Sequence, residues 1–311
     1  MTRLVEVSAH LPSTAVPIAS LGESFGLTPV DVRVYQKFYG LRQVLLDPTA
    51  HLSDLLVAAA KGLSSLSDAA HRIRYLIHAR TVQPTGPYSV NPLLDVRRVL
   101  GLEHAVAFGV TQHACASGLL AVDLAGRLLA GDGPDALALV LTGEKTYRHV
   151  SEIMPVPTVM GEAAAACLVS ATGAGDPLLS YATRTYGELH AVSPETRAAF
   201  QRMYPRALAD VMTDAAARAG LSLADITLVL PHNVNRISWL GLARLLDFPV
   251  ERIFLDNVPV TGHCFCADPF LNYAEAVERD LLRRGDHYLM ASVGLGATFS
   301  AMVFRYGGGL S

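Results

Sequence analysis

Cys115 is the residue of this chain whose neighbours best suit it to act as a nucleophile. It lies within residues 111–118, directly before a long apolar stretch that predicts a helix. The first N–H groups of a helix and the positive end of its dipole favour a thiolate there. Small residues on both sides leave room for a substrate to reach the sulfur. A buried, inert cysteine is the alternative, because most free cysteines are of that kind.

Two histidines in the second half of the chain are candidates for the base or anion stabiliser that a cysteine nucleophile needs. His232 follows a strand predicted at 226–230, and α/β sheets bind ligands at the carboxyl ends of such strands. His263 lies in the turn of residues 261–269, which precedes another predicted helix. The respective alternatives are a histidine that caps a helix and a solvated loop histidine.

The same turn raises a rival hypothesis, a metal-dependent enzyme. His263, Cys264, Cys266 and Asp268 are plausible ligand types. The spacing argues against zinc, because Cys-x-Cys has only one nearby histidine and no second cysteine pair.

A glycine turn at residues 293–299 follows a predicted strand, and such a turn can aim a backbone N–H at a developing oxyanion. A simple tight turn is the alternative there.

The composition limits the class of protein. The chain has 311 residues, 51% hydrophobic and 17% charged, so it can bury a large core and an oligomer interface. A net charge of −3 argues against nucleic acid as the main partner. Its four cysteines are unevenly spread, and no apolar run approaches the roughly 20 residues of a membrane span. We expect a soluble, cytoplasmic protein with reduced thiols and no membrane partner.

The elements that position these residues follow a repeated plan. Predicted strands cover residues 1–10, 73–78, 105–109, 136–142, 163–170, 226–230 and 287–292, and predicted helices cover 52–66, 91–100, 118–130, 195–219, 234–246 and 273–284. In both halves a turn with cysteine, a helix, a Gly-Asp stop and a buried strand follow one another. This repetition predicts a duplicated α/β core with halves at 1–170, which carries Cys115, and 171–311, which carries both histidines. A chance likeness of short Leu-rich helices is the alternative.

Six segments carry a family resemblance. They are Ser8-Ala9-His10-Leu11-Pro12, Tyr39-Gly40-Leu41-Arg42, His113-Ala114-Cys115-Ala116-Ser117-Gly118, Met160-Gly161-Glu162-Ala163-Ala164-Ala165, Leu230-Pro231-His232-Asn233-Val234-Asn235 and Gly294-Leu295-Gly296. In this order they resemble segments of the 3-oxoacyl-ACP synthase III family of the thiolase fold, across nearly the whole chain. The turn around Cys115 and the Pro-His-x-x-Asn motif are specific when they occur together.

The resemblance implies a thiolase-like, duplicated five-layer α-β-α-β-α core and a ketosynthase III-like acyltransferase. An acyl-CoA or acyl-carrier-protein thioester would acylate Cys115, and the backbone N–H groups of Cys115 and Gly296 would hold the oxyanion. His232 would act in the second half-reaction, a decarboxylative condensation with a malonyl carrier-protein thioester in a fatty-acid, polyketide or other natural-product pathway. The family also implies a homodimer and no metal or other cofactor. A non-catalytic dimer partner that keeps the fold is the alternative of another class.

The turn at His263 departs from the family pattern. Where the family has Asn in Gly-Asn-Thr-Ser, this chain has Gly262-His263-Cys264-Phe265. A neutral imidazole can donate one N–H to an enolate oxygen, so two histidines still allow condensation, which we favour slightly. Asp268 could instead orient His232 or His263 as a base, and a Cys-His-acid set favours acyl transfer to a hydroxyl or amine.

The resemblance also suggests where substrates bind. The expected substrate-binding residues are Arg42, Tyr88, Asn233, Asn235 and Phe265. Tyr88 is expected at the tip of residues 81–92, a segment that would reach toward the partner's pocket. The basic CoA-binding positions of the family are not clearly matched, which favours a carrier protein as acyl donor. The sequence carries no readable code for the acyl group or the acceptor.

Overall fold

The main sheet of the molecule runs through both halves of the chain. The computed structural model describes residues 1–22, 27–82, 91–146, 156–190 and 193–308. The sheet has the order β5-β4-β6-β7-β1-β8-β11-β10-β9, and β2 and β3 form a separate pair. The strands are β1 (Arg3–His10), β2 (Thr14–Pro17), β3 (Gln43–Leu46), β4 (Ile73–Ala79), β5 (Val106–Val110), β6 (Leu137–Glu144), β7 (Ala163–Ser170), β8 (Asp176–Thr185), β9 (Ile226–Pro231), β10 (His287–Gly294) and β11 (Thr298–Arg305).

The helices cover both faces of this sheet. They are α1 (Ile18–Leu21), α2 (Pro29–Val34), α3 (Leu52–Lys61), α4 (Leu66–Ala69), α5 (Pro92–Val99), α6 (Ser117–Leu129), α8 (Pro194–Arg218), α9 (Arg236–Leu246), α10 (Val258–Thr261) and α11 (Asp268–Glu278). Among the described helices, none is long and apolar enough to cross a membrane.

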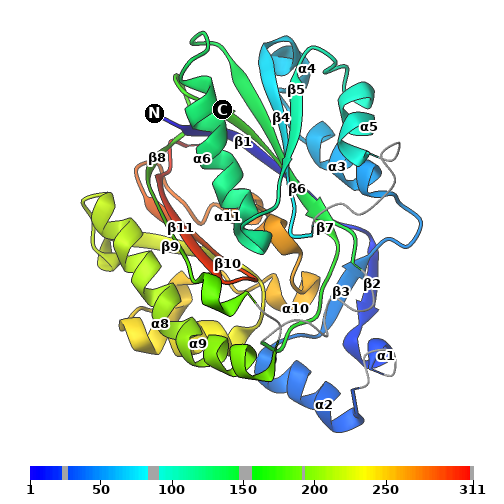
Figure 1. Ribbon diagram of the computed structural model, residues 1–311, viewed down its shortest axis with the longest axis vertical. Coiled ribbons are helices and arrows are strands. Elements are labelled where there is room, and N and C mark those ends of the chain that lie inside the picture. The colour runs from blue at the N-terminus through cyan, green and yellow to red at the C-terminus, as the bar shows by residue number, and fades with distance from the viewer. Residues whose placement is uncertain (23–26, 83–90, 147–155, 191–192, 309–311) are drawn as a thin grey trace.

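Three apolar cores separate the layers. One lies between α3, α5 and the first strands, a second surrounds α6 and α11, and a third lies between α8, α9 and the last strands. Figure 1 shows α3 and α5 at the upper right, α8 and α9 at the lower left, and α6 between them. This is the α-β-α-β-α order expected from the sequence. The strands β5, β4, β6, β7 and β1 come from residues 3–170 and the other four from residues 176–305, while the division into two domains stays a prediction.

Strand β7 shows how the sequence produces this layering. All eight of its residues are buried, and the strand begins with four alanines. Successive side chains of a strand point to opposite faces. Ala163, Ala165 and Cys167 accordingly belong to the core around α6, whereas Ala164 and Ala166 belong to the core under α3. Small side chains on both faces therefore let a helix pack closely on each side of the strand.

The two cysteine-containing turns have the same construction. A short helical turn, Ala114–Ala116, leads into α6, and another, Phe265–Ala267, leads into α11. Ala114 has a φ of 46° and Phe265 a φ of 57°, a left-handed conformation that costs a non-glycine residue on the order of 1–3 kcal/mol. Cys115 and Cys266 each follow such a residue. The counterpart of Cys115 in the second turn is therefore Cys266, three residues after His263.

Several predicted boundaries were wrong. Helix α11 begins at Asp268 instead of residue 273, because Pro269 suits the first turn of a helix. It ends at Glu278 instead of residue 284, and Asp280, with a φ of 52°, lies beyond that end. Helix α3 ends at Lys61, five residues early. The sequence analysis also missed β8 and β11, in which polar and apolar residues do not alternate throughout; β8 also has Pro177 as its second residue.

Gly294 gives a test of how tightly the end of β10 packs on the Cys115 turn. A Cβ at Gly294 would lie 1.8 Å from the carbonyl oxygen of His113. We expect Gly294→Ala to lower the free energy of unfolding by about 1–3 kcal/mol, because the turn must move to admit the methyl group. Urea denaturation measures this, with Gly241→Ala as control, since a Cβ at Gly241 meets nothing within 4 Å. Equal stability of the two variants would contradict this packing.

Candidate active site

Cys115 lies at the buried junction of the two halves, with a polar group on either side of its sulfur. The residue is 2% exposed and lies two residues before the start of α6, whose N-terminus favours negative charge. The Nε2 atom of His263 lies 3.3 Å from Sγ of Cys115. The hydroxyl of Thr81 donates a hydrogen bond to the same sulfur, also at 3.3 Å. The sulfur therefore has an imidazole and a hydroxyl in contact with it.

Asp268 continues this line of contacts beyond His263. The Nδ1 atom of His263 lies 2.5 Å from Oδ2 of Asp268. The same carboxylate accepts the backbone N–H of Asn233 at 2.5 Å and that of Cys264 at 2.7 Å. Since both oxygens accept hydrogen bonds, the carboxylate orients Nδ1 of His263 as a donor and leaves Nε2 pointing at Cys115. Of the two histidines that Asp268 could orient as a base, His263 is therefore the one that its side chain contacts.

The surroundings of His263 favour its protonated form. Burial alone would lower the pKa of His263, but the Asp268 carboxylate and the Cys115 sulfur raise it to about 10. A protonated imidazole beside a thiol stabilises the thiolate. Cys115, His263 and Asp268 are therefore arranged so that a Cys115 thiolate would form an ion pair with the His263 imidazolium.

His232 is buried beside this line but has different partners. Its ring centroid lies 6.1 Å from that of His263. Its Nε2 atom lies 2.8 Å from the hydroxyl oxygen of Tyr204, and Nδ1 lies 3.4 Å from the carbonyl oxygen of Ala291. Burial and the positive charge of His263 lower the pKa of His232 to about 3. The two histidines therefore hold opposite protonation states at neutral pH.

A buried glutamate holds Thr81 at the sulfur. Glu144, the last residue of β6, accepts the backbone N–H groups of Thr81 at 2.9 Å and Val82 at 3.2 Å. The guanidinium group of Arg80 lies 3.5 Å from the same carboxylate. Burial raises the pKa of Glu144 above its ordinary value, although these donors partly oppose the shift. Sequence analysis missed Thr81, Glu144 and Tyr204; a lone carboxylate at the end of an apolar strand was the one available signal.

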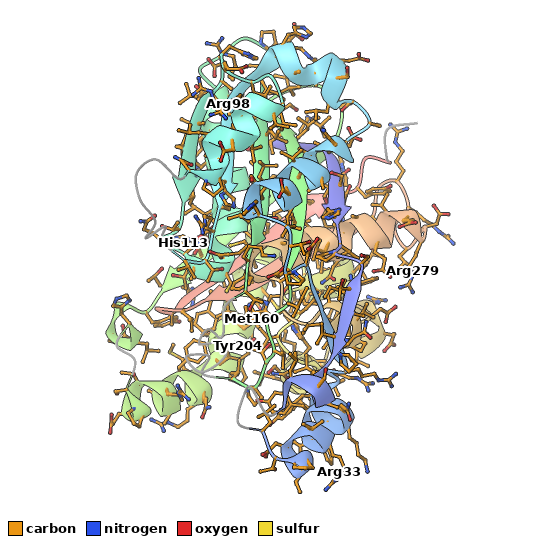
Figure 2. The ribbon with its side chains drawn as sticks, turned by 90° about the vertical axis from the view of Figure 1, so that its right-hand side faces the viewer. Arg33, Arg98, His113, Met160, Tyr204 and Arg279 are labelled. Atoms are coloured by element: carbon orange, nitrogen blue, oxygen red, sulfur yellow. The ribbon has the colours of Figure 1, made fainter. Side chains whose placement is uncertain are left out.

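The matching cysteine of the second turn supports the first turn. Sγ of Cys266 donates to the carbonyl oxygen of Ala114 at 3.2 Å, and the hydroxyl of Ser292 donates to that of Cys115 at 2.9 Å. Burial, with the nearby Cys115, raises the pKa of Cys266 well above its ordinary value. Cys266 is thus a neutral thiol that fixes the backbone around Cys115. In Figure 2, His113, which adjoins this turn, lies at mid-height with Met160 and Tyr204, between Arg98 and Arg33 at the two ends.

The predicted substrate-binding residues of the Pro-His-x-x-Asn motif have their side chains engaged elsewhere in the fold. Asn233 exchanges hydrogen bonds with Asn272, at 2.9 and 3.4 Å. Asn235 caps α9 through Ser238 N at 2.8 Å and donates to Pro157 O at 2.9 Å. Their substrate-binding role stays a prediction. The observed contacts hold in place the segment that follows His232.

The other predicted residues lie at different distances from the sulfur. The ring of Phe265 is buried with its centroid 6.2 Å from that of His263. Gly296 lies in the turn between β10 and β11, and its oxyanion role stays a prediction. Tyr88 lies outside the described residues. No group of three or more His, Cys, Asp and Glu side chains in the described ranges is arranged to hold a metal ion.

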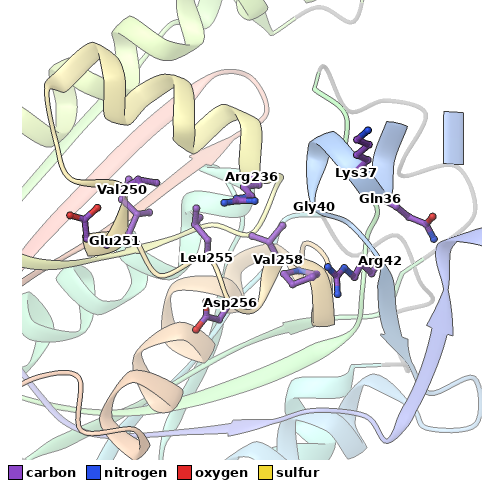
Figure 3. Close-up of a pocket in the computed structure, with 12 residues that line it drawn as sticks. Gln36, Lys37, Gly40, Arg42, Arg236, Val250, Glu251, Leu255, Asp256 and Val258 are labelled. Atoms are coloured by element: carbon purple, nitrogen blue, oxygen red, sulfur yellow. The ribbon is translucent and has the colours of Figure 1, made fainter. Parts of the chain in front are cut away.

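Arg42 lines a surface cavity of about 530 Å³. Its walls also include Lys37, Gly40, Arg236 and Val258. Figure 3 shows Lys37 and Arg42 at the right of this cavity, Arg236 near its centre, and the acidic Glu251 and Asp256 at the left and below. Arg236 begins α9 four residues after His232, and Val258 begins α10 five residues before His263. The cavity is therefore built on the same two segments as the two histidines.

Comparison of the sequence with known proteins shows which family this chain resembles. Residues 216–306 match the family model "3-Oxoacyl-[acyl-carrier-protein (ACP)] synthase III C terminal". The beta-ketoacyl-[acyl-carrier-protein] synthase III of Lactobacillus delbrueckii subsp. bulgaricus is 25% identical over 97% of this chain and 98% of its own length. That of Roseiflexus castenholzii is 36% identical, but the match spans only 33% of this chain and 31% of that relative.

Two solved structures share the fold. ChlB3, described as an acyltransferase, superposes with a TM-score of 0.85 at 20% identity over 98% of both chains. The 3-oxoacyl-[acyl-carrier-protein] synthase III of Aquifex aeolicus superposes with a TM-score of 0.83 at 20% identity, over 98% of this chain and 100% of that one. The predicted thiolase-like fold is thereby confirmed. The chain is therefore similar to 3-oxoacyl-ACP synthase III proteins, in its C-terminal part by the family model and over nearly its whole length by sequence and fold.

Proposed function

We propose that this protein transfers an acyl group through a thioester on Cys115 and passes it to a hydroxyl or amine acceptor. The observation that carries the proposal is the unbroken line from Cys115 Sγ to His263 and on to Asp268, with contacts of 3.3 and 2.5 Å. A nucleophile, a base and a carboxylate that orients the base form the arrangement used for acyl transfer through a covalent intermediate.

The first half-reaction loads the enzyme. The thiolate of Cys115 attacks the carbonyl carbon of an acyl thioester, and a tetrahedral oxyanion forms. The backbone N–H groups of Cys115 and Gly296 are the proposed donors to this charge. The intermediate collapses with loss of the donor's thiolate, which takes the proton from His263 and leaves as a thiol. The acyl-enzyme then has a thioester on Cys115 and a neutral His263.

The second half-reaction uses that neutral histidine. Its Nδ1–H remains on Asp268, so its Nε2 carries a lone pair directed at the thioester. This atom removes the proton from an attacking alcohol or amine, and the collapse of the second oxyanion releases the Cys115 thiolate beside a protonated His263. The resting ion pair is regenerated. The structural likeness to an acyltransferase, ChlB3, supports the same chemistry.

Decarboxylative condensation is the second candidate, since many relatives bear the name synthase III. Here a malonyl thioester would lose carbon dioxide, and its enolate oxygen would need N–H donors. The pair of histidines first suggested this branch. The hydrogen bond between His263 and Asp268 favours transfer to an alcohol or amine, because it keeps the hydrogen on Nδ1 and makes Nε2 of His263 an acceptor in the acyl-enzyme.

The acyl donor carries a phosphate-rich arm in this proposal. Lys37, Arg42 and Arg236 provide positive charge along the cavity that adjoins the segments of His232 and His263. A coenzyme A or carrier-protein phosphopantetheine arm matches that charge, and the donor is a substrate instead of a bound cofactor. Arg42 is the one predicted substrate-binding residue that lies in this cavity.

A homodimer is part of the proposal as well. In the part of the chain that the structure describes, β5 pairs only with β4 and forms one end of the sheet. An open strand edge can pair with a second chain. Val106 of β5 is 58% exposed, and Leu94 and Val99 of the adjacent α5 are 44% and 58% exposed. A second copy that continues the sheet through β5 would cover this apolar strip.

The acyl-enzyme is tested by intact mass after incubation with acyl-CoA and acyl carrier protein. We expect a mass increase of one acyl group in the wild type and in Cys167→Ala, a buried cysteine of β7, and none in Cys115→Ala. His263→Ala should slow acylation by about 10²–10⁴-fold, because the proton donor for the leaving thiol is lost. Wild type without an adduct would instead support a non-catalytic dimer partner. With malonyl carrier protein, carbon dioxide release would indicate condensation.

Asp268→Asn tests the ion pair through its pH dependence. His263 stays protonated below its raised pKa of about 10, so the imidazolium that would stabilise the thiolate is present at neutral pH and is lost as the pH rises through that value. Without the carboxylate the pKa of His263 falls, and the loss moves to lower pH. We expect iodoacetamide to alkylate Cys115 more slowly at pH 7 in Asp268→Asn than in the wild type, because less imidazolium remains to stabilise the thiolate, and we expect the two rates to converge at high pH. Asp123→Asn, a change on α6 at the ion pair with Arg127, is the control, and identical profiles would refute the pairing.

The dimer is tested by replacing Val106. We expect Val106→Asp to elute as one chain in size-exclusion chromatography with light scattering, and the wild type to elute as two. Leu245→Asp changes a residue of α9 that is 47% exposed and away from β5, so it should stay dimeric. A dimer that persists in Val106→Asp at low concentration would exclude β5 as the contact.

A further inference from the structure

Tyr204 is a buried polar residue that the proposed chemistry does not use. It lies on α8, is 4% exposed, and its ring packs against Phe200 and Phe299 with centroids 5.6 and 5.9 Å away. Within this aromatic environment its hydroxyl lies 2.8 Å from Nε2 of His232. The hydroxyl is thus held by packing at the one ring nitrogen of His232 that could serve a substrate.

The other side of His232 decides which atom donates in this bond. A carbonyl oxygen only accepts, and that of Ala291 lies 3.4 Å from Nδ1 of His232, so Nδ1 carries the hydrogen. Nε2 of the neutral ring then has a lone pair, and the hydroxyl of Tyr204 donates to it. Two further hydrogen bonds fix the backbone that carries the ring. The His232 N–H donates to Ala291 O at 3.0 Å, and the indole N–H of Trp239 donates to His232 O at 3.0 Å.

The alternative protonation state of His232 is disfavoured. A doubly protonated ring would place a second positive charge 6.1 Å from His263, which is itself charged in the resting site. It would also leave the hydroxyl of Tyr204 to accept a bond inside an apolar cluster. Burial and His263 lower the pKa of His232 to about 3, which agrees with the neutral ring.

Neither histidine therefore offers an N–H group to a substrate once Cys115 is acylated. His263 keeps its hydrogen on the Asp268 side, and His232 keeps its hydrogen on the Ala291 side. A site of this kind can accept a proton from an alcohol or amine. It offers no imidazole N–H to the oxygen of an enolate, which decarboxylation of a malonyl thioester requires.

We propose that Tyr204 is a specificity-determining positioning residue, whose hydroxyl holds His232 in the Nδ1–H form and so directs the acyl-enzyme toward alcohol or amine acceptors and away from malonyl thioesters. Tyr204 acts through His232 and needs no contact with the substrate. The inference rests on the proposed acyl transfer through Cys115.

Nitrogen-15 NMR of ¹⁵N-histidine-labelled protein tests the tautomer directly. In the wild type we expect the His232 signals of one protonated nitrogen, Nδ1, and one unprotonated nitrogen, Nε2, unchanged between pH 6 and pH 8. Tyr204→Phe should shift the Nε2 signal or average the two forms. Tyr273→Phe removes a buried hydroxyl that bonds to Asp176 at 2.7 Å, in a different part of the molecule, and should leave His232 unchanged. A protonated Nε2 in the wild type would overturn the proposal.

Decarboxylation of malonyl carrier protein by the acyl-enzyme tests the consequence. We expect carbon dioxide release by the wild type to equal that of Cys115→Ala, and Tyr204→Phe to exceed the wild type by at least about tenfold. Release by the wild type at the rate of its acyl transfer, or no gain in Tyr204→Phe, would overturn the role of Tyr204. Intact mass of the same samples reports acylation of Cys115. If the acyl group never loads, the proposed function fails, while the NMR result still decides the role of Tyr204 in the tautomer.

Discussion

The buried carboxylate of Asp268 is the interaction on which the rest of the site depends. A buried charge is tolerated only when hydrogen bonds replace the water it has lost. Asp268 is fully buried and accepts bonds from His263, from the backbone of Asn233 and from the backbone of Cys264. These donors come from the turn before α11 and from the segment after β9. One carboxylate therefore sets the position of His263 and anchors the segment that carries His232.

The same interaction explains why two neighbouring histidines differ. His263 faces a carboxylate and a sulfur, both of which stabilise positive charge, whereas His232 faces a tyrosine hydroxyl and a backbone carbonyl. Environments that move two titratable groups in opposite directions are a common way to divide acid and base roles in an active site. In this protein that division comes from the Asp268 carboxylate, which raises the pKa of His263, and from burial beside the charged His263, which lowers the pKa of His232.

The duplicated turns show how one local design yields two different cysteines. Cys115 and Cys266 occupy matching positions after a strained residue, and both are buried. The hydroxyl of Thr81 lies near both sulfurs, at 3.3 Å from that of Cys115 and 3.6 Å from that of Cys266, whereas the imidazole of His263 contacts the sulfur of Cys115. The thiol of Cys266 donates a hydrogen bond to the carbonyl oxygen of Ala114, and burial near Cys115 raises the pKa of Cys266. The two cysteines therefore differ because His263, which belongs to the second turn, reaches the sulfur in the first turn.

The sequence by itself determined the local features: the turn before α6, the Pro-His-x-x-Asn motif, most helices and strands, and the family to which they point. Hydrophobic periodicity, helix starts and short motifs act over a few residues, so they are readable without a fold. The tertiary structure alone decided which histidine meets Cys115. His263 and Cys115 are 148 residues apart, and Tyr204 and His232 are 28 apart on different elements. Both histidines lie in buried turns with similar local signals, and only the packing of α6, α8 and α11 brings each one to its own partner.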